Sequence, residues 1–215
     1  MKKVFLLSIA LIGAASTFAQ TVTYAIKAGV NFSEISASIQ NITASSKSLT
    51  GFHVGGVVDL GFSKSFSIQP GILYTTKGGS SSDVTADGTT SGANASKITL
   101  NYLEIPVNFL YHAPAGKGSV FLGGGPYVGL GLSGSAPLVD GNGQATGQTQ
   151  SVHFGSSTDD IANPDFGINF LGGYKFDGGF TLSAGYGLGL ANLSNDNSVT
   201  IHNKGLSFSL GYFFK

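Results

Sequence analysis

The sequence predicts an all-β fold, an eight-stranded antiparallel up-and-down barrel that crosses a membrane. Three observations lead to this prediction. Apolar residues alternate with polar or small ones along eight segments, and a period of two is that of a strand with two unlike faces. Only 10 % of the residues are charged and 33 of 215 are glycine, against a usual glycine share of about 7 %. The connections between the segments alternate between short and long.

The first predicted strand, residues 23–33, has the pattern that the others repeat. Ile26 and Val30 lie on one face, whereas Lys27 and Gly29 lie on the other. A segment of about 9–11 residues is long enough to cross a bilayer as a tilted strand. The remaining strands are predicted, in order, at residues 52–62, 65–75, 102–112, 119–133, 165–176, 180–191 and 205–214.

The connections indicate which end of the barrel faces which side of the membrane. Short turns are predicted at residues 63–64, 114–118 and 177–179, and long connections rich in Ser, Thr, Gly, Asn and Asp at 35–48, 77–97, 134–161 and 192–203. Outer-membrane barrels have short periplasmic turns and longer extracellular loops. We therefore expect three periplasmic turns, four long extracellular loops and both chain ends on the periplasmic side.

A soluble sandwich or a lipocalin-like barrel would show a similar alternation. Its polar face would meet water and carry Lys and Glu, but here that face is mostly Gly, Ser and Asn. Aromatic residues also gather near the strand ends, as in the girdles at the two membrane interfaces. They are Tyr24, Phe62, Phe66, Tyr74, Tyr111, Phe166, Tyr174, Phe176, Phe180 and Phe214. These features favour the membrane barrel.

The first nineteen residues are typical of a signal peptide. A charged start at residues 1–3 precedes an apolar stretch at 4–15, and the segment Thr17-Phe18-Ala19 ends on a small residue suited to signal peptidase. The apolar stretch is shorter than the roughly 20 residues of a spanning helix. We expect cleavage after Ala19, a barrel domain at residues 20–215 and localisation in the cell outer membrane.

The composition excludes several other classes of protein. The formal net charge is zero, so no basic patch suggests nucleic acid as a partner. All eleven basic residues are lysines, and cysteine is absent, which leaves no disulfide and no thiolate metal site. We expect no cofactor, no metal site and no catalytic residue.

Four segments resemble the PorT-like outer-membrane β-barrel family of Bacteroidota. They read IKAGVNFS from residue 26, YLEIPVNFLY from 102, FLGGGPYVGLGL from 121 and GLSFSLGYFF from 205. The resemblance covers essentially the whole mature chain, and YLEIP is its most specific part. It implies an eight-stranded barrel of the kind described as porin family or outer membrane protein beta-barrel, in which few members have an assigned activity. One departure is Lys215, which follows the aromatic residue that usually ends such chains.

Parity along the strands predicts which polar residues face the interior. Leu103 and Ile105 face lipid, so Glu104 faces the lumen, because a charge in hydrocarbon is costly. The same argument places Lys27, Asp59 and Lys175 inside, together with the uncharged Gln69 and Asn108. With Glu104, the inward charges are two acids and two bases. Lys27, Asp59 and Lys175 lie toward the short-turn end and could form one network, whereas the partner of Glu104 depends on the strand register.

Two interpretations of these lumen residues remain open. They either form a polar plug in an interior just wide enough for side chains, or line a narrow pore for ions or small solutes. The sequence favours a structural or interaction role in a monomer that contacts outer-membrane lipid and, through its loops, an unidentified protein or surface ligand. A barrel enzyme acting on lipid or peptide is a further alternative. It would need a histidine beside an acid, as His153 with Asp159 or Asp160, or His202 with Asp196, could supply.

Overall fold

The computed structural model describes most of the chain as one long barrel. The described residues are 21–39, 42–84, 90–139, 145–157, 160–196 and 198–214. The predicted signal peptide and its cleavage site at Ala19 lie outside them. Within them, no helix is long and apolar enough to cross a membrane.

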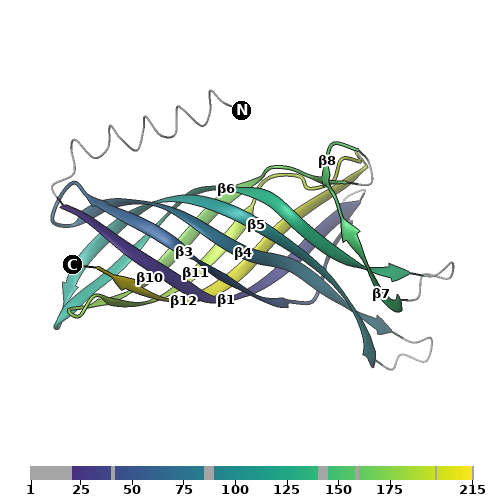
Figure 1. Ribbon diagram of the computed structural model, residues 1–215, viewed down its shortest axis with the longest axis horizontal. Helices are drawn as coiled ribbons and strands as arrows, with labels where there is room; N and C mark the ends of the chain where they lie inside the picture. Colours follow the sequence, from purple (N-terminus) through teal and green to yellow (C-terminus); the bar gives the residue numbers. More distant parts are fainter. Residues whose placement is uncertain are drawn as a thin grey trace.

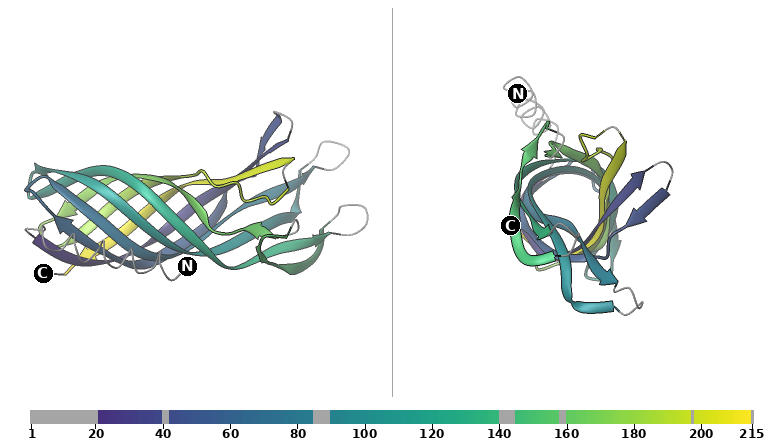
Figure 2. Two further views of the ribbon diagram at one scale, coloured as in Figure 1. Left: turned by 90° about the horizontal axis from the view of Figure 1, so that it is seen from above. Right: turned by 90° about the vertical axis from the view of Figure 1, so that its right-hand side faces the viewer.

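Eight long strands close into a ring, which confirms the predicted fold class (Figures 1 and 2). They are β1 (Thr21–Ile39), β3 (Leu49–Gly61), β4 (Phe66–Val84), β5 (Thr90–Ala115), β6 (Gly118–Val139), β10 (Asp165–Phe176), β11 (Phe180–Gly189) and β12 (Val199–Phe213). Neighbours along the ring pair antiparallel, and the ring closes where β12 pairs with β1. The right-hand view of Figure 2 shows the barrel end-on, so that the closed ring is visible.

The long connections contain more strand than the sequence predicted. Residues 77–97 were expected to form a loop, but β4 continues to Val84 and β5 begins at Thr90. Four short strands lie on the same side, namely β2 (Ile42–Ser45), β7 (Ala145–Val152), β8 (Phe154–Gly155) and β9 (Ile161–Ala162). Beyond the bilayer a strand needs no apolar face. Its backbone hydrogen bonds continue there, but the alternation of apolar and polar residues that reveals a strand in the sequence is missing.

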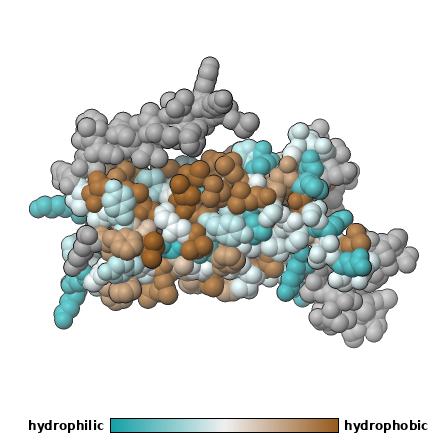
Figure 3. Space-filling view, in the orientation of Figure 1, coloured by the Kyte–Doolittle hydropathy of each residue, from teal (hydrophilic) through white to brown (hydrophobic). Residues whose placement is uncertain are grey.

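An apolar band covers the outside of the barrel. The large side chains of the outward positions are exposed, and Leu122 and Leu210 are 69 % and 65 % accessible. Figure 3 shows apolar residues over the middle of the barrel and hydrophilic residues toward its two ends. A soluble monomer rarely exposes so large an apolar surface, whereas lipid would cover it.

Aromatic side chains pack together near the short turns. Phe66 contacts Phe62, Phe109 and Tyr111, with ring centroids 6.2, 6.1 and 5.2 Å away. On the other side of the ring, Tyr212 contacts both Phe180 and Phe214. Such a belt is expected at a membrane–water interface.

Side chains fill part of the interior. An apolar floor made of Ala25, Val57 and Phe213 lies toward the short-turn end. Inward-facing glycines leave space for large side chains of other strands. The Tyr127 ring, for instance, lies 2.7 Å from where a Cβ of Gly167 would be. The charged group around Lys77 lies farther from the short turns than this floor.

Candidate functional site

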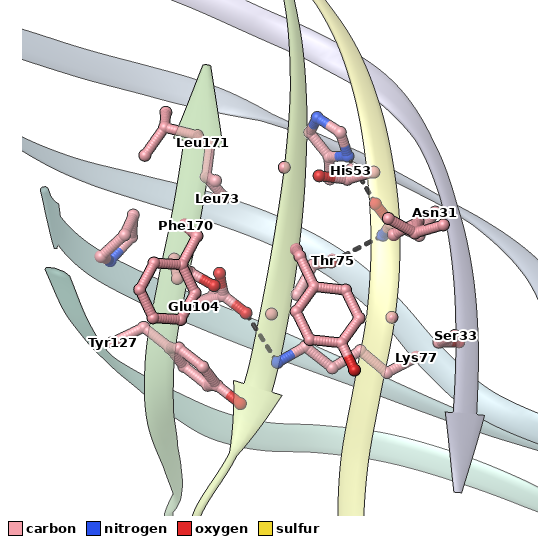
Figure 4. A pocket seen from close by; sticks show the side chains of 18 of the residues that line it. Asn31, Ser33, His53, Leu73, Thr75, Lys77, Glu104, Tyr127, Phe170 and Leu171 are labelled. Carbon is pink, nitrogen blue, oxygen red and sulfur yellow. Dashed lines mark hydrogen bonds and ion pairs between the residues drawn. The ribbon is translucent and has the colours of Figure 1, made fainter. Parts of the chain in front are cut away.

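A lysine held between two carboxylates lies inside the barrel. Lys77 Nζ is 2.7 Å from Glu104 Oε2 and 3.4 Å from Asp165 Oδ2. The side chains of Lys77 and Glu104 are nearly buried, and that of Asp165 is completely buried. Figure 4 shows the Lys77–Glu104 ion pair beside Tyr127. Because these residues come from β4, β5 and β10, the pairs join strands that are not all adjacent.

Further groups from two more strands surround this lysine. Its ammonium lies 4.1 Å from the centre of the Tyr127 ring and 5.5 Å from that of Tyr102, distances at which cation–π attraction operates. Asp165 Oδ2 also accepts hydrogen bonds from the Tyr127 hydroxyl at 3.4 Å and from Asn203 Nδ2 at 3.3 Å. We call these six residues, Lys77, Tyr102, Glu104, Tyr127, Asp165 and Asn203, the cross-lumen cluster.

A second buried network centres on His53 and Asn31 (Figure 4). His53 Nδ1 is 2.7 Å from Asn31 Oδ1, and its Nε2 is 2.9 Å from Ser209 Oγ. Asn31 Nδ2 donates to Thr75 Oγ1 at 2.9 Å and to the backbone oxygens of residues 52 and 76. This network links β12, β1, β3 and β4 side by side, so it stiffens one wall of the barrel.

We expect Asn31→Ala to weaken the barrel measurably. The substitution leaves His53 Nδ1 and Thr75 Oγ1 without their partner, and an unsatisfied buried polar group costs about 1–3 kcal/mol. Urea unfolding followed by circular dichroism would measure the loss. Asn169→Ala is the matched control, because Asn169 also lines the lumen but has no side-chain hydrogen bond within the described residues. An equal loss in both variants would contradict the role given to Asn31.

The lumen that the described residues enclose contains cavities, two of which bear on the predicted residues. The larger, of about 100 Å³, is lined by polar residues that include Lys27, His53, Gln69, Glu104 and Asn108. The smaller, of about 30 Å³, lies toward the short-turn end and touches Lys27, Gln69, His112, Lys175, Thr181 and Ser183. Since one water molecule needs roughly 10–15 Å³ measured in this way, both cavities have room for water.

The structure places the predicted lumen residues around these cavities. Lys27, Gln69, Glu104 and Asn108 line the larger cavity, and Lys175 lines the smaller one. Asp59 is buried and lies near enough to His112 for an electrostatic interaction.

The direct network suggested for Lys27, Asp59 and Lys175 does not form. No ion pair joins any two of them in the described part of the chain. Lys175 Nζ lies instead over the Phe213 ring, 4.0 Å from its centre. Lys27 interacts electrostatically with Glu104, although without direct contact.

Sequence reasoning missed the two other charged members of the cross-lumen cluster. Lys77 was assigned to a loop, because the residues that follow it are polar and small. Leu73 and Thr75 face the lumen, and alternate residues of a strand share a face. Extending the strand by two residues would therefore have placed Lys77 in the lumen as well. Asp165 has the parity of Gly167 and lies at the first position of β10. With both included, the inward charges named here are three acids and three bases.

The His153–Asp160 and His202–Asp196 pairs considered for an enzyme do not form in the described part of the chain. His112 Nε2 is 2.8 Å from Ser67 Oγ, and His202 Nδ1 is 2.9 Å from the backbone oxygen of Ala191. His153 is exposed, and Asp159 lies outside the described residues. No group of three metal-binding side chains occurs in the part that the structure describes.

Residues 18–195 match the family model of the outer membrane protein beta-barrel domain. The chain belongs to this family. Membership places the protein in the outer membrane, in agreement with the apolar band and the aromatic belt. No curated protein matches the chain.

Several solved structures are similar to this barrel. Neisserial surface protein A is 14 % identical with a TM-score of 0.46, over 91 % of this chain and 100 % of that one. OprG from Pseudomonas aeruginosa is 9 % identical with a TM-score of 0.48, over 91 % and 97 %. Ail, the attachment invasion locus protein of Yersinia pestis, is 12 % identical with a TM-score of 0.41, over 88 % and 98 %. Likeness at this level does not extend to activity or ligand.

Proposed function

We propose that this protein is a closed outer-membrane barrel with a structural or interaction role and no catalytic activity. The observation that carries the proposal is the cross-lumen cluster. It ties β4, β5, β6, β10 and β12 together through the interior by ion pairs and hydrogen bonds. Eight strands leave an interior just wide enough for side chains, so a cluster of this kind fills it. The lumen residues Lys27, Asp59, Gln69, Glu104, Asn108 and Lys175 then have a structural role.

If the lumen is closed, a binding partner meets the protein at its extracellular connections. There the paired strands β4 and β5, and β6 and β7, project beyond the barrel (Figure 2, left). Loops positioned by a rigid scaffold commonly carry binding residues. Contact with an unidentified protein or surface ligand is therefore assigned to this end, while lipid covers the apolar band of a monomer.

The proposal includes the processing and the origin of the chain. Residues 1–19 act as a signal peptide that is removed after Ala19, as the charged start and the small residues before the cleavage site suggest. The YLEIP segment on β5 supports assignment to the PorT-like barrels of Bacteroidota. N-terminal sequencing of the protein from outer membranes should begin at Gln20, and a start elsewhere would contradict the cleavage site.

The second candidate function is a narrow pore. The cavities favour this candidate, because the residues that line the larger one include polar and charged side chains such as Lys27 and Glu104. The two functions differ in conductance. We expect the protein purified from outer membranes to stay silent in a planar bilayer, once its heat-dependent gel shift shows that it is folded. Steady single-channel openings of the unmodified protein would overturn the closed barrel in favour of the pore.

A further inference from the structure

A short flap folds against the extracellular mouth of the barrel. It consists of the described residues 153–157 and 160–163, between β7 and β10, and contains β8 and β9 (Figure 1). These two strands pair with each other in a small sheet of their own, separate from the sheet that forms the barrel. Ile161 N also donates to His153 O at 2.9 Å. The flap is therefore a folded unit that is not part of the barrel wall.

One aromatic side chain of the flap enters the mouth. The Phe154 ring packs edge-on against the Tyr102 ring, with centroids 5.6 Å apart, and it occupies the space that a side chain at Gly131 would need. Tyr102 and Leu100, which lies further out on β5, are both fully buried. Because the Tyr102 ring in turn lies near the Lys77 ammonium, Phe154 covers the cross-lumen cluster from the extracellular side.

A single side chain ties the flap to the neighbouring connection. Asn195 Nδ2 lies within hydrogen-bond distance of three backbone oxygens of the flap, at 3.2, 2.9 and 3.0 Å. These oxygens belong to Gly155, Ser157 and Asp160. Asn195 itself is held to the barrel, because Leu193 N donates to Ile201 O on β12 at 2.8 Å and Leu193 is fully buried.

Two further hydrogen bonds position the flap. Asn163 Oδ1 accepts from Gly131 N at 3.1 Å, and Ala162 N donates to Leu193 O at 2.9 Å. A strand of the barrel is bonded along both of its edges, whereas the flap is attached at separate points. Segments with few such bonds open at a lower free energy than a packed ladder, so the flap can open while the barrel stays folded.

We propose that the flap is a lid that opens and closes over the extracellular mouth independently of the barrel, with Asn195 as its latch and Phe154 as its plug. In the closed form, Phe154 separates the cross-lumen cluster from the outside. In the open form, the flap turns on its connections to β7 and β10, and small water-soluble molecules reach Leu100 and Tyr102. The lid controls access to the lumen whether or not the barrel conducts.

Cysteine labelling tests the lid, because the chain has no cysteine of its own. In Leu100→Cys the thiol lies beneath the flap, and a water-soluble methanethiosulfonate should modify it slowly. Adding Asn195→Ala should make this reaction at least tenfold faster. Asn101→Ala is the matched control, because it removes side-chain hydrogen bonds with Thr76 and Ser133 on the barrel wall and should leave the rate unchanged. Equal rates with and without Asn195→Ala would overturn the lid.

A second cysteine distinguishes an open lid from a loosened barrel. Ala25→Cys lies in the apolar floor, and Asn195→Ala should not change its labelling. Faster labelling of both cysteines would mean that the whole barrel loosens, and the proposal would fail.

Hydrogen exchange followed by mass spectrometry gives a readout that needs no cysteine variant. The backbone amides of Ile161 and Ala162 should exchange together and faster than those of β10, and Asn195→Ala should speed up both by the same factor. Exchange of these amides at the rate of the β10 ladder would show that the flap opens only with the barrel, which contradicts the lid.

Discussion

Replacing Lys77 by alanine should lower the free energy of unfolding of the barrel by about 3–5 kcal/mol, the usual cost of removing one partner of a buried ion pair. The substitution leaves Glu104 and Asp165 facing each other's charge without the ammonium that now contacts both. It also removes the cation that the Tyr127 ring contacts. Urea unfolding in detergent, followed by circular dichroism and by the gel shift between folded and unfolded forms, would measure the loss.

Lys204→Ala is the matched control. Lys204 also contacts an acid, with its Nζ 3.5 Å from Glu34 Oε2, but both side chains are about one-third exposed. Exposed ion pairs contribute about 0–1 kcal/mol, so this variant should unfold almost as the unmodified protein does. Similar losses in the two variants would show that the cross-lumen cluster contributes no more than a surface pair.

The same substitution should open the lumen. Without the Lys77 side chain, water can reach Glu104 and Asp165 from the larger cavity, which Lys77 and Glu104 already line. We expect Lys77→Ala to show cation-selective openings in a planar bilayer, because two unpaired carboxylates attract cations. A silent Lys77→Ala variant that is folded would mean that other side chains close the barrel.

The sequence predicts which face each residue takes more reliably than it predicts which residues meet. Period-two alternation places Glu104 in the lumen, because its neighbours Leu103 and Ile105 are apolar and the strand has only two faces. It cannot identify Lys77 as the partner. In the β4–β5 ladder Glu104 lies opposite Leu73, so the lysine reaches it from four residues further along its strand.

The boundaries of the long connections were the other weak point of the prediction. Within the bilayer an apolar face marks each strand, and the strand at residues 165–176 was predicted with the bounds that β10 has. Outside the bilayer that contrast vanishes, so β4 beyond Thr76 resembled a loop. Lys77 lies just at this transition, and Asp165 lies at the first position of its strand. Lys77 and Asp165 were missed because they lie where the alternating pattern ends and begins.

A neutral replacement of the whole charged group should recover part of what Lys77→Ala loses. In the triple variant Lys77→Met, Glu104→Gln, Asp165→Asn, every side chain keeps about its size but none carries charge. No buried charge is then left unpaired, which is the main cost of removing one partner of a buried ion pair, whereas a buried amide without a partner costs about 1–3 kcal/mol. We expect the triple variant to unfold between Lys77→Ala and the unmodified protein, far from the sum of its single substitutions, because residues in one network are not additive.

Conductance of this triple variant separates two ways of closing the lumen. If side-chain volume closes it, the neutral barrel stays silent, because methionine and the two amides occupy the space between Tyr127 and Asn203. This is the result we expect, since the interior of eight strands admits side chains and little else. Openings in the neutral barrel would contradict it, and would mean that the Lys77 ion pairs, rather than the bulk of the cluster, hold β4 against β10. Either result is interpretable only beside Lys77→Ala, which changes volume and charge together.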